Sequence, residues 1–306
     1  MEGLVISGSN NYFIVESKDK KNYTCSIKGK VLRLSNNVYN PLCPGDIVEI
    51  EKIDENQALI TSLKERKNEI ARLNIKTYKK QTLASNLDLI ICVTTPKEPP
   101  FRPRFVDRVI VQAEKENIPI IIVMNKVDLQ ISKDVSFRLS NWKDMGYEVI
   151  QTSAKNSKNI EELKKRIEGL KLAVIGQSGV GKSSLLNALD SSLSLKTSSI
   201  SNKFDRGVHT TTKANLFKIK GGATIIDTPG IRSFSLWNVA EEELIQYFRE
   251  MKDLSLMCKF GFSCKHEKEK GCAILENVSN NKILYDRYES YIRIKEEIIA
   301  LKKEIK

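Results

Sequence analysis

One stretch of sequence decides the fold of this 306-residue chain: Gly176-Gln177-Ser178-Gly179-Val180-Gly181-Lys182-Ser183-Ser184. An apolar strand predicted over residues 172–175 leads into it and a helix predicted over residues 182–189 leaves it, which is the setting of a phosphate-binding loop. The glycines let backbone N–H groups converge on phosphates, and the Lys182 ammonium can reach the β and γ oxygens. The Ser183 hydroxyl can bind Mg²⁺. We therefore predict a nucleoside triphosphate site formed by residues 176–184.

Apolar strands alternate with amphipathic helices on both sides of this loop. Strands are predicted over residues 87–93, 118–124, 148–152, 172–175 and 223–226, and helices over residues 105–115, 160–170 and 182–189. This alternation is typical of a parallel α/β sheet covered by helices. Loops at the carboxyl edge of such a sheet form its ligand crevice, so motifs at the strand ends are expected to meet there.

A second phosphate motif, Asp227-Thr228-Pro229-Gly230, follows the strand predicted over residues 223–226. A carboxylate at this strand end can hold Mg²⁺ through water, and the Gly230 N–H can sense the γ-phosphate. Such a tetrapeptide alone could be an ordinary turn. Its position downstream of the phosphate-binding loop favours the second half of the same site, with Asp227 and Gly230 as contacts.

Two further motifs indicate which base is bound. They end two of the predicted strands and read Asn125-Lys126-Val127-Asp128 and Ser153-Ala154-Lys155. Asp128 can accept hydrogen bonds from N1–H and the 2-amino group of guanine, whereas adenine offers neither donor. Asn125 can brace neighbouring loops, the Lys126 stem can cover the base, and a backbone N–H of residues 153–155 can meet guanine O6. Together these motifs favour GTP over ATP.

The order of the motifs is circularly permuted. The base-reading motifs precede the phosphate-binding loop, whereas most GTPases place them after it. Because all of these loops are expected to line one edge of a parallel sheet, the permutation preserves the site while it moves the chain termini. The loop that begins at Asp227 then leads directly into the C-terminal part, so a nucleotide-driven shift could be transmitted to a partner-binding element.

A polar segment between the two phosphate motifs is predicted to be a mobile switch loop. Its last part reads Arg206-Gly207-Val208-His209-Thr210-Thr211-Thr212. One threonine of this loop should complete the coordination of Mg²⁺ when GTP is bound. We favour Thr211, with Thr210 and Thr212 as alternatives.

The group that orients the attacking water is not a glutamine. Many GTPases carry Gln just past the Asp227 motif, but this chain has Ile231 and Arg232, and an apolar side chain cannot orient water. His209 is the one histidine outside the cysteine cluster. We predict that His209 positions or polarises the water once a partner orders the loop, with a purely structural contact as the alternative. Slow turnover without the partner would follow.

Residues 3–65 predict a small β-barrel. Runs rich in β-branched residues lie at residues 3–6, 12–16, 22–34, 46–53 and 58–63, separated by turn-forming Asn, Pro and Gly. About five such strands fit a barrel of the oligonucleotide/oligosaccharide-binding (OB) kind, which can bind nucleic acid or be purely architectural. The basic stretch over residues 65–81 is interpreted as a linker to the α/β sheet.

The chain after residue 236 is predicted to be a third unit. It contains a helix around residues 241–251, a cysteine cluster, and a charged helical tail over residues 282–306. The tail carries an apolar face around Tyr288 and Tyr291, which suits packing on the core as well as RNA contact. We therefore expect three domains: an OB-fold RNA-binding domain at 1–66, a circularly permuted α/β GTPase domain at 67–236, and a helical zinc-binding domain at 237–306.

The cysteine cluster offers three thiols and one imidazole close together in sequence, at Cys258, Cys264, His266 and Cys272. Their number and softness are those of a closed tetrahedral zinc site. Four ligands leave no open position for a catalytic water, so the predicted role is structural. Free buried cysteines are the alternative, and Cys25, Cys43 and Cys92 are interpreted in that way.

Composition limits the class of protein further. Lys and Arg outnumber Asp and Glu by 50 to 38, and the net charge of +12 favours RNA or DNA as a partner, although a merely soluble basic surface is the alternative. Six cysteines are too few for a disulfide scaffold in a chain of this length. No secretory signal and no membrane span are recognised. We expect a cytoplasmic protein without membrane contact, and a monomer.

Taken together, these features resemble the RsgA (YjeQ) family. The resemblance covers nearly the whole chain and rests on the permuted motifs, the metal cluster, and residues 84–88, 207–212, 227–234 and 287–291. It implies a GTPase that binds the 30S ribosomal subunit and its 16S rRNA late in maturation, is stimulated by the subunit, and leaves after hydrolysis. The implied cofactors are one structural Zn²⁺ and Mg²⁺ with GTP. Val208, where similar proteins often carry Arg, is a mild departure.

Two other classes of protein remain open. A nucleotide-gated RNA-binding protein with negligible turnover would keep every motif but would lack a working water-positioning group. A P-loop ATPase or nucleotide kinase is disfavoured by Asp128, because its carboxylate would face the lone pair of adenine N1.

Overall fold

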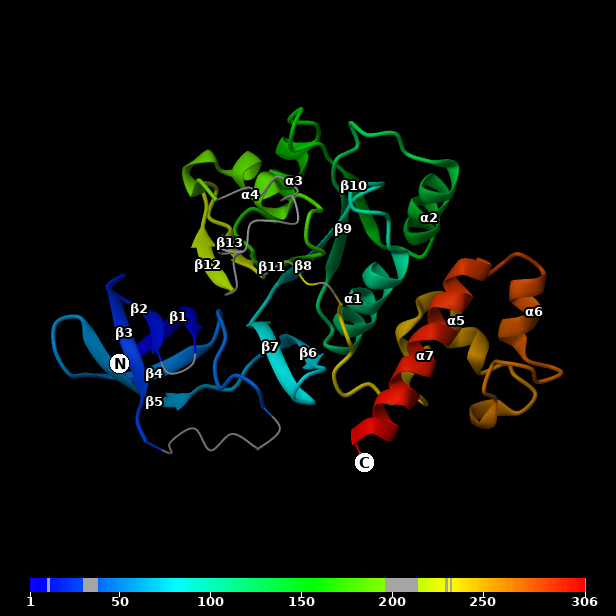
Figure 1. Ribbon diagram of the computed structural model, residues 1–306, viewed down its shortest axis with the longest axis horizontal. Coiled ribbons are helices and arrows are strands. Elements are labelled where there is room, and N and C mark those ends of the chain that lie inside the picture. Colours follow the sequence, from blue (N-terminus) through cyan, green and yellow to red (C-terminus); the bar gives the residue numbers. More distant parts are fainter. Residues whose placement is uncertain (10–11, 30–37, 196–213, 229–230, 232, 306) are drawn as a thin grey trace, which may run out of the picture.

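The computed structural model describes the chain apart from residues 10–11, 30–37, 196–213, 229–230, 232 and 306. Figure 1 shows an α/β sheet with its helices in the middle, a β-barrel on one side and a helical C-terminal unit on the other. This arrangement confirms the predicted fold class. None of the described helices is long and apolar enough to cross a membrane.

Five described strands close into the N-terminal barrel: β1 (Glu2–Ser9), β2 (Tyr12–Ser17), β3 (Asn22–Ile27), β4 (Ile47–Lys52) and β5 (Gln57–Leu63). β1 pairs with β2 and β4, and β3 pairs parallel with β5, so the ladder returns to its first strand. Alternate residues such as Phe13, Val15 and Ile60 form the barrel core, as the period of two predicts. β3 ends at Ile27, and residues 30–34 of the strand predicted over residues 22–34 lie outside the described part of the chain.

Parallel strands form the centre of the molecule, in the order β10 (Glu148–Gln151), β9 (Ile120–Met124), β8 (Leu89–Thr94), β11 (Lys171–Gly176) and β13 (Thr224–Asp227). β12 (Asn215–Lys218) continues this sheet antiparallel to β13. One face of the sheet is covered by α1 (Pro103–Lys115) and α2 (Lys133–Asp144), and the other by α3 (Ile160–Ile167) and α4 (Lys182–Leu189). Because both faces are covered, the central strands β8 and β9 are buried along their whole length and almost entirely apolar.

Residues 65–81, interpreted above as a linker, contain most of a β-hairpin. β6 (Glu69–Asn74) pairs antiparallel with β7 (Lys79–Ser85). The linker interpretation was wrong. The basic residues of this stretch suggested a solvated segment, although Ile70, Ala71 and Leu73 are buried. The backbone N–H of Leu73 donates to the Ser235 carbonyl at 3.0 Å, which ties the hairpin to the segment that follows the Asp227 loop.

A buried ion pair fixes the barrel against this hairpin. Asp46 is fully buried, and its carboxylate accepts hydrogen bonds from Nε and Nη2 of Arg66 at 2.7 and 2.8 Å. The Ser85 hydroxyl and the Cys43 N–H complete its partners at 2.6 and 2.9 Å. Breaking a buried pair of this kind typically costs about 3–5 kcal/mol, so these bonds define how the barrel sits on the hairpin.

The C-terminal unit contains the 3₁₀ helices η2 (Leu244–Tyr247) and η3 (Gly261–Ser263) and the α-helices α5 (Arg249–Ser255), α6 (Ala273–Ser279) and α7 (Tyr285–Ile305). The helix predicted around residues 241–251 is divided into η2 and α5, because the extended and fully buried Phe248 lies between them. α7 confirms the predicted helical tail. Its buried face, which includes Tyr291, Ile294 and Ile298, packs on the core of the α/β domain.

A buried ionic cluster attaches α7 to the α/β domain. Asp107 of α1 is fully buried and forms ion pairs with Arg138 of α2 and with Nη1 of Arg287 of α7, the latter at 2.5 Å. Nε1 of Trp142 donates to the same carboxylate at 3.1 Å, and Nε of Arg287 donates to Glu250 at 2.7 Å. The two guanidiniums hold the pKa of Asp107 below its usual value although burial opposes them.

Candidate functional site

The motifs predicted at strand ends meet at the carboxyl edge of the parallel sheet. Residues 125–128 follow β9, residues 153–155 follow β10, residues 176–181 follow β11, and Asp227 ends β13. Because these strands are parallel neighbours, their ends lie together in spite of the permuted order along the chain. The base-reading and phosphate-binding halves of the candidate site are therefore adjacent.

The predicted phosphate-binding loop turns tightly between β11 and α4. Gly181 adopts a left-handed conformation with φ of 89° where α4 begins. A Cβ at this position would lie 2.6 Å from Nδ2 of Asn125, so the close approach of the two loops requires glycine. Val180 is buried in the core, whereas Ser178 faces solvent and Ser183 lies half-buried in the first helical turn. The loop is thus held in the core at Val180, while its exposed part lies at the N-terminus of α4, where backbone N–H groups can bind an anion.

Lys182 and Asp227 carry the charge at the centre of this loop. Nζ of Lys182 donates to the Gly176 carbonyl at 3.0 Å, and burial lowers the pKa of this lysine while Asp227 opposes the change. Burial raises the pKa of Asp227 to about 6 in spite of Lys182. Among the described residues, no group hydrogen-bonds the buried Oδ1 of Asp227. An unpaired buried carboxylate oxygen is a fitting ligand for Mg²⁺ or for a water bound to it.

Asn125 connects the two halves of the site. Its Nδ2 donates to the carbonyl oxygens of Val180 at 3.1 Å and Gly181 at 3.4 Å. Its Oδ1 accepts from the N–H of Ala154 at 3.2 Å and from the Thr152 hydroxyl at 3.3 Å. The contact from Thr152 was not predicted, because an isolated threonine at the end of a strand carries no sequence signal. One buried side chain thereby braces both loops.

Lys126 and Asp128, the residues predicted to contact the base, lie in the loop that follows β9. Nζ of Lys126 donates to the carbonyl oxygens of Gly179 at 2.8 Å and Glu98 at 2.6 Å, so its stem crosses from one loop to the next. Asp128 is exposed, and its Oδ1 accepts from the Ser153 hydroxyl at 2.5 Å, the main cause of its lowered pKa. An ionised and oriented carboxylate can accept two hydrogen bonds from guanine. The Glu98 contact was missed because it involves only backbone oxygen.

Several predicted site residues lie outside the described part of the chain. These are His209, Thr211 and Gly230, and their roles remain predictions. Ile231 is described: it is buried in the core, and its N–H donates to the Gly176 carbonyl at 3.2 Å. Gln177 and Ser184 lie buried and half-buried in the phosphate loop and α4, and Lys155 is exposed beside Ala154.

The four predicted metal ligands come together in the C-terminal unit. Cys258, Cys264, His266 and Cys272 are buried, and their ligand atoms lie within 4.8 Å of one another. The Sγ atoms of Cys258 and Cys272 are 3.9 Å apart, and Nδ1 of His266 is 3.6 and 3.5 Å from them. Zinc bonds of about 2.3 Å to sulfur and about 2.0 Å to nitrogen require roughly these spacings in a tetrahedron. The cluster can therefore hold one four-coordinate metal ion.

Groups that are not ligands shape the metal loop. The Tyr288 hydroxyl of α7 donates to the His266 carbonyl at 2.8 Å, and Nζ of Lys295 donates to the Lys265 carbonyl at 3.0 Å. The carboxylate of Glu269 accepts from backbone N–H groups of the loop at 2.9–3.1 Å. Such outer contacts orient the ligands, and here they also join the metal loop to the helix that α1 anchors.

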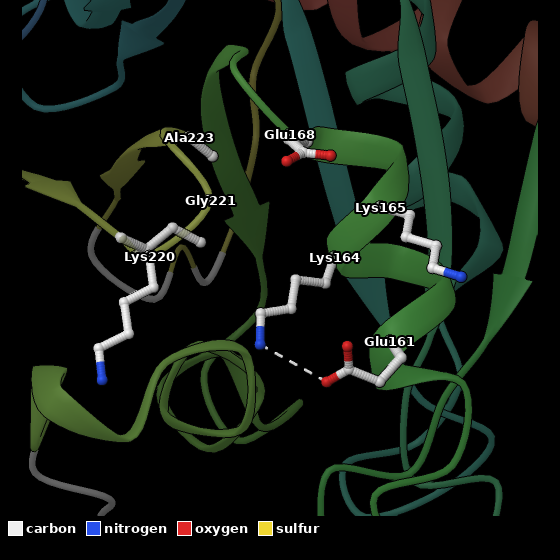
Figure 2. A pocket seen from close by; sticks show the side chains of 8 residues that line it. Glu161, Lys164, Lys165, Glu168, Lys220, Gly221 and Ala223 are labelled. Carbon is white, nitrogen blue, oxygen red and sulfur yellow. Dashed lines mark ion pairs between the residues drawn. The ribbon is translucent and has the colours of Figure 1, made fainter.

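A separate hollow lies away from both sites. It has a volume of about 240 Å³ and lies between α3 and the turn that joins β12 to β13 (Figure 2). Lys164 is paired with Glu161 at 3.5 Å, and Lys165 points away from the turn. The turn precedes β13 and so belongs to the amino edge of the sheet, opposite the nucleotide motifs. This hollow is therefore not part of the nucleotide site.

Comparison with known proteins covers almost the whole chain. A profile of the RsgA GTPase family matches residues 63–237. Two curated proteins, each called "Small ribosomal subunit biogenesis GTPase RsgA", are similar over 97% of this chain. The protein from Borreliella afzelii is 41% identical over 299 residues and is covered to 96% of its length. The protein from Christiangramia forsetii is 37% identical over 303 residues and is also covered to 96%.

Solved structures are similar over the same extent. The crystal structure of YjeQ from Thermotoga maritima has a TM-score of 0.73 and 32% sequence identity, with 97% of this chain and 98% of that chain covered. The structure of YloQ, described as a circularly permuted GTPase, has a TM-score of 0.68 and 28% identity, with coverages of 98% and 95%. The similarity therefore includes the barrel and the C-terminal unit as well as the sheet.

We predict that Asn125→Ala weakens nucleotide binding by about 10-fold or more. The change leaves the Ala154 N–H and the Val180 carbonyl without their partner, and a buried polar group left unpaired costs about 1–3 kcal/mol. Titration with fluorescent GDP measures the affinity. Asn68→Ala is the matched control, because the side chain of Asn68 likewise bonds to backbone groups of the same domain, in its case to the N–H and the carbonyl of Leu87. An equal loss of GDP affinity in the two variants would contradict the proposal that Asn125 holds the two loops of the site together.

Proposed function

The chain belongs to the RsgA GTPase family, and from that premise we propose that it binds the 30S ribosomal subunit and assists its late maturation. It hydrolyses GTP to GDP and phosphate, and the subunit stimulates this reaction. The relatives named above carry the words small ribosomal subunit biogenesis GTPase in their names, and they match this chain over nearly their whole length.

One observation supports GTP as the substrate above all others. The Asn125 side chain joins the phosphate-binding loop to the loop of Ala154, so that a base and a triphosphate can be held at one sheet edge. Asp128 stands ionised at the base end and selects guanine through N1–H and the 2-amino group. The proposed nucleotide contacts are Asn125, Lys126, Asp128, residues 153–155, residues 176–184, Asp227 and Gly230.

Mg²⁺ is the proposed partner of the triphosphate. Ser183 and Thr211 would bind the ion directly and Asp227 through water, and the ion would supply charge neutralisation at the phosphate oxygens. The buried and unpaired Oδ1 of Asp227 supports this assignment. Lys182 is held by loop carbonyls at the same place, so its ammonium is already positioned to transfer its hydrogen bonds to β and γ oxygens.

We propose that His209 positions the attacking water. Ile231 supports this choice, because its apolar side chain is buried and turned into the core where many GTPases present a glutamine to the water. Histidine can accept a proton or hold a water in its neutral form near physiological pH. Stimulation by the subunit would then act through His209 without any additional catalytic group.

Zinc is the proposed ion of the Cys258, Cys264, His266 and Cys272 cluster. The ligand spacings, the three thiols and the closed four-coordinate arrangement support it. The role is structural, because four protein ligands leave no open position on the ion for a catalytic water.

The barrel and the basic surface suit an RNA partner. Tyr12 and Tyr39 are 68% and 52% exposed on the barrel unit, and exposed aromatic rings on a positively charged protein can stack on unpaired bases. We propose 16S rRNA as the partner, a monomer as the active form, and the cytoplasm as its location. The proposed division remains 1–66 for the RNA-binding barrel, 67–236 for the GTPase domain and 237–306 for the zinc-binding domain.

We predict that purified 30S subunits raise GTP turnover strongly, whereas 50S subunits and 70S ribosomes do not. With ATP in place of GTP, no particle should raise the turnover. Phosphate release measures the rate for the wild type and for His209→Ala. The variant should bind GDP as the wild type does and lose the stimulated rate, because only the water-positioning group is removed. Equal rates with every particle would contradict the proposed partner, and an unchanged stimulated rate in the variant would contradict the role of His209.

We predict that the purified protein contains one zinc ion and that Cys272→Ser prevents its binding. Removal of the ion by a chelator should lower the thermal unfolding midpoint, since zinc binding to such sites contributes about 10 kcal/mol or more of folding free energy in small domains. Elemental analysis measures the content. Cys25→Ser is the control, because Cys25 is buried in the barrel, and it should retain the ion. A metal-free wild-type protein of unchanged stability would contradict the assignment.

A further inference from the structure

The barrel and the nucleotide-binding sheet share one continuous ladder. β1 pairs antiparallel with β12 through Ser7 and Asn215, and β12 pairs antiparallel with β13 through Asn215 and Asp227. Ser7, Asn215 and Asp227 therefore stand in one row across three strands. Figure 1 shows the corresponding arrangement, with β12 and β13 beside the barrel. The row ends on the carboxylate assigned to Mg²⁺.

β1 contributes side chains to the cores on both sides of this junction. Val5 is fully buried in the barrel core, whereas the neighbouring Leu4 and Ile6 pack against the core of the α/β domain. The pairing of β1 with β2 shifts its register between Val5 and Ser7, and on the other edge of β1 the partner changes from β4 at residues 2–4 to β12 at Ser7. Such a bulge re-aims a strand at a defined point. β1 thus belongs to both domains.

Close packing leaves the barrel little freedom at this junction. A Cβ on Gly45 would lie 2.3 Å from the Ser85 carbonyl oxygen and 3.2 Å from Cδ1 of Ile226, the residue before Asp227. On the outer side, Lys218 of β12 forms an ion pair with Glu16 of β2. A displacement of the barrel would therefore act directly on β12 and on the end of β13.

We propose that the barrel is a positioning element of the nucleotide site. β1 holds Asp227 in place through the row Ser7–Asn215–Asp227, and Gly45, which precedes β4, does so by packing on Ile226. The inference rests on the proposed role of Asp227 towards Mg²⁺. Its consequence is that a change at the barrel junction weakens the part of nucleotide affinity that depends on Mg²⁺ and leaves the Mg²⁺-free affinity unchanged.

Gly45→Ala tests this inference through binding rather than turnover. Affinity for a non-hydrolysable GTP analogue is measured with Mg²⁺ and with EDTA. The ratio of the two affinities is the gain in affinity due to Mg²⁺, called the gain below. Gly29→Ala is the matched control, because Gly29 is also a barrel glycine with positive φ, but a Cβ there would meet none of the described residues within 4 Å. Gly45→Ala should reduce the gain by about 5-fold or more, since coupling between two sites typically changes affinity by at least this factor. Gly29→Ala should leave the gain unchanged.

A charge exchange provides the second test if Gly45→Ala does not fold. Glu16→Lys and Lys218→Glu each place like charges opposite one another and should reduce the gain, and the double exchange should restore it. Glu51→Lys, which breaks the exposed pair between Lys28 and Glu51 within the barrel, is the control. Wild-type gains in Gly45→Ala, or in both charge variants, would overturn the inference. A wild-type protein without any gain would instead refute the role of Asp227 itself.

Discussion

Parallel pairing of β10, β9, β8, β11 and β13 is the constraint on which the rest of the structure depends. It brings the ends of these strands to one edge, so the loops predicted to read a base and to bind phosphates are neighbours whatever their order in the chain. Asn125 then holds the two kinds of loop together, because its side-chain amide hydrogen-bonds to the backbone of both. The circular permutation therefore leaves the geometry of the site intact and changes only which segments enter and leave it.

Those segments are where the other two units attach. β13 ends at Asp227, and the chain then passes the hairpin, which bonds to Ser235, before it enters the C-terminal unit. In the sheet, β13 lies between β11 and β12, and β12 is paired in turn with β1 of the barrel. The strand that carries Asp227 is thus linked to both of the other units, to the barrel through β12 and to the C-terminal unit through the segment that follows it. Asp107 with Arg138 and Arg287 fixes one of them, and Asp46 with Arg66 fixes the other, both with buried charges that tolerate little displacement.

Local patterns predicted much of this architecture. α4 begins and ends at the predicted residues 182 and 189, and the parallel strands were found because they are short, apolar and followed by recognisable motifs. The cysteine cluster was found from ligand type and spacing. The hairpin of β6 and β7 was missed because Lys79 and Lys80 gave the stretch a solvated appearance. Pairing of Ser7 with Asn215, and of Asp107 with Arg287, could not be predicted, because partners so distant in sequence leave no local pattern.

The central claim, that this edge of the sheet selects guanine through Asp128, is tested most directly by the base preference of Asp128→Asn. Xanthine has a carbonyl oxygen where guanine has its 2-amino group, so an amide can donate to it while its oxygen accepts from N1–H. Equilibrium binding of GDP and of xanthosine diphosphate to the wild type and the variant is the measurement. The account predicts that the variant loses affinity for GDP and gains affinity for xanthosine diphosphate. An unchanged preference for GDP would contradict it.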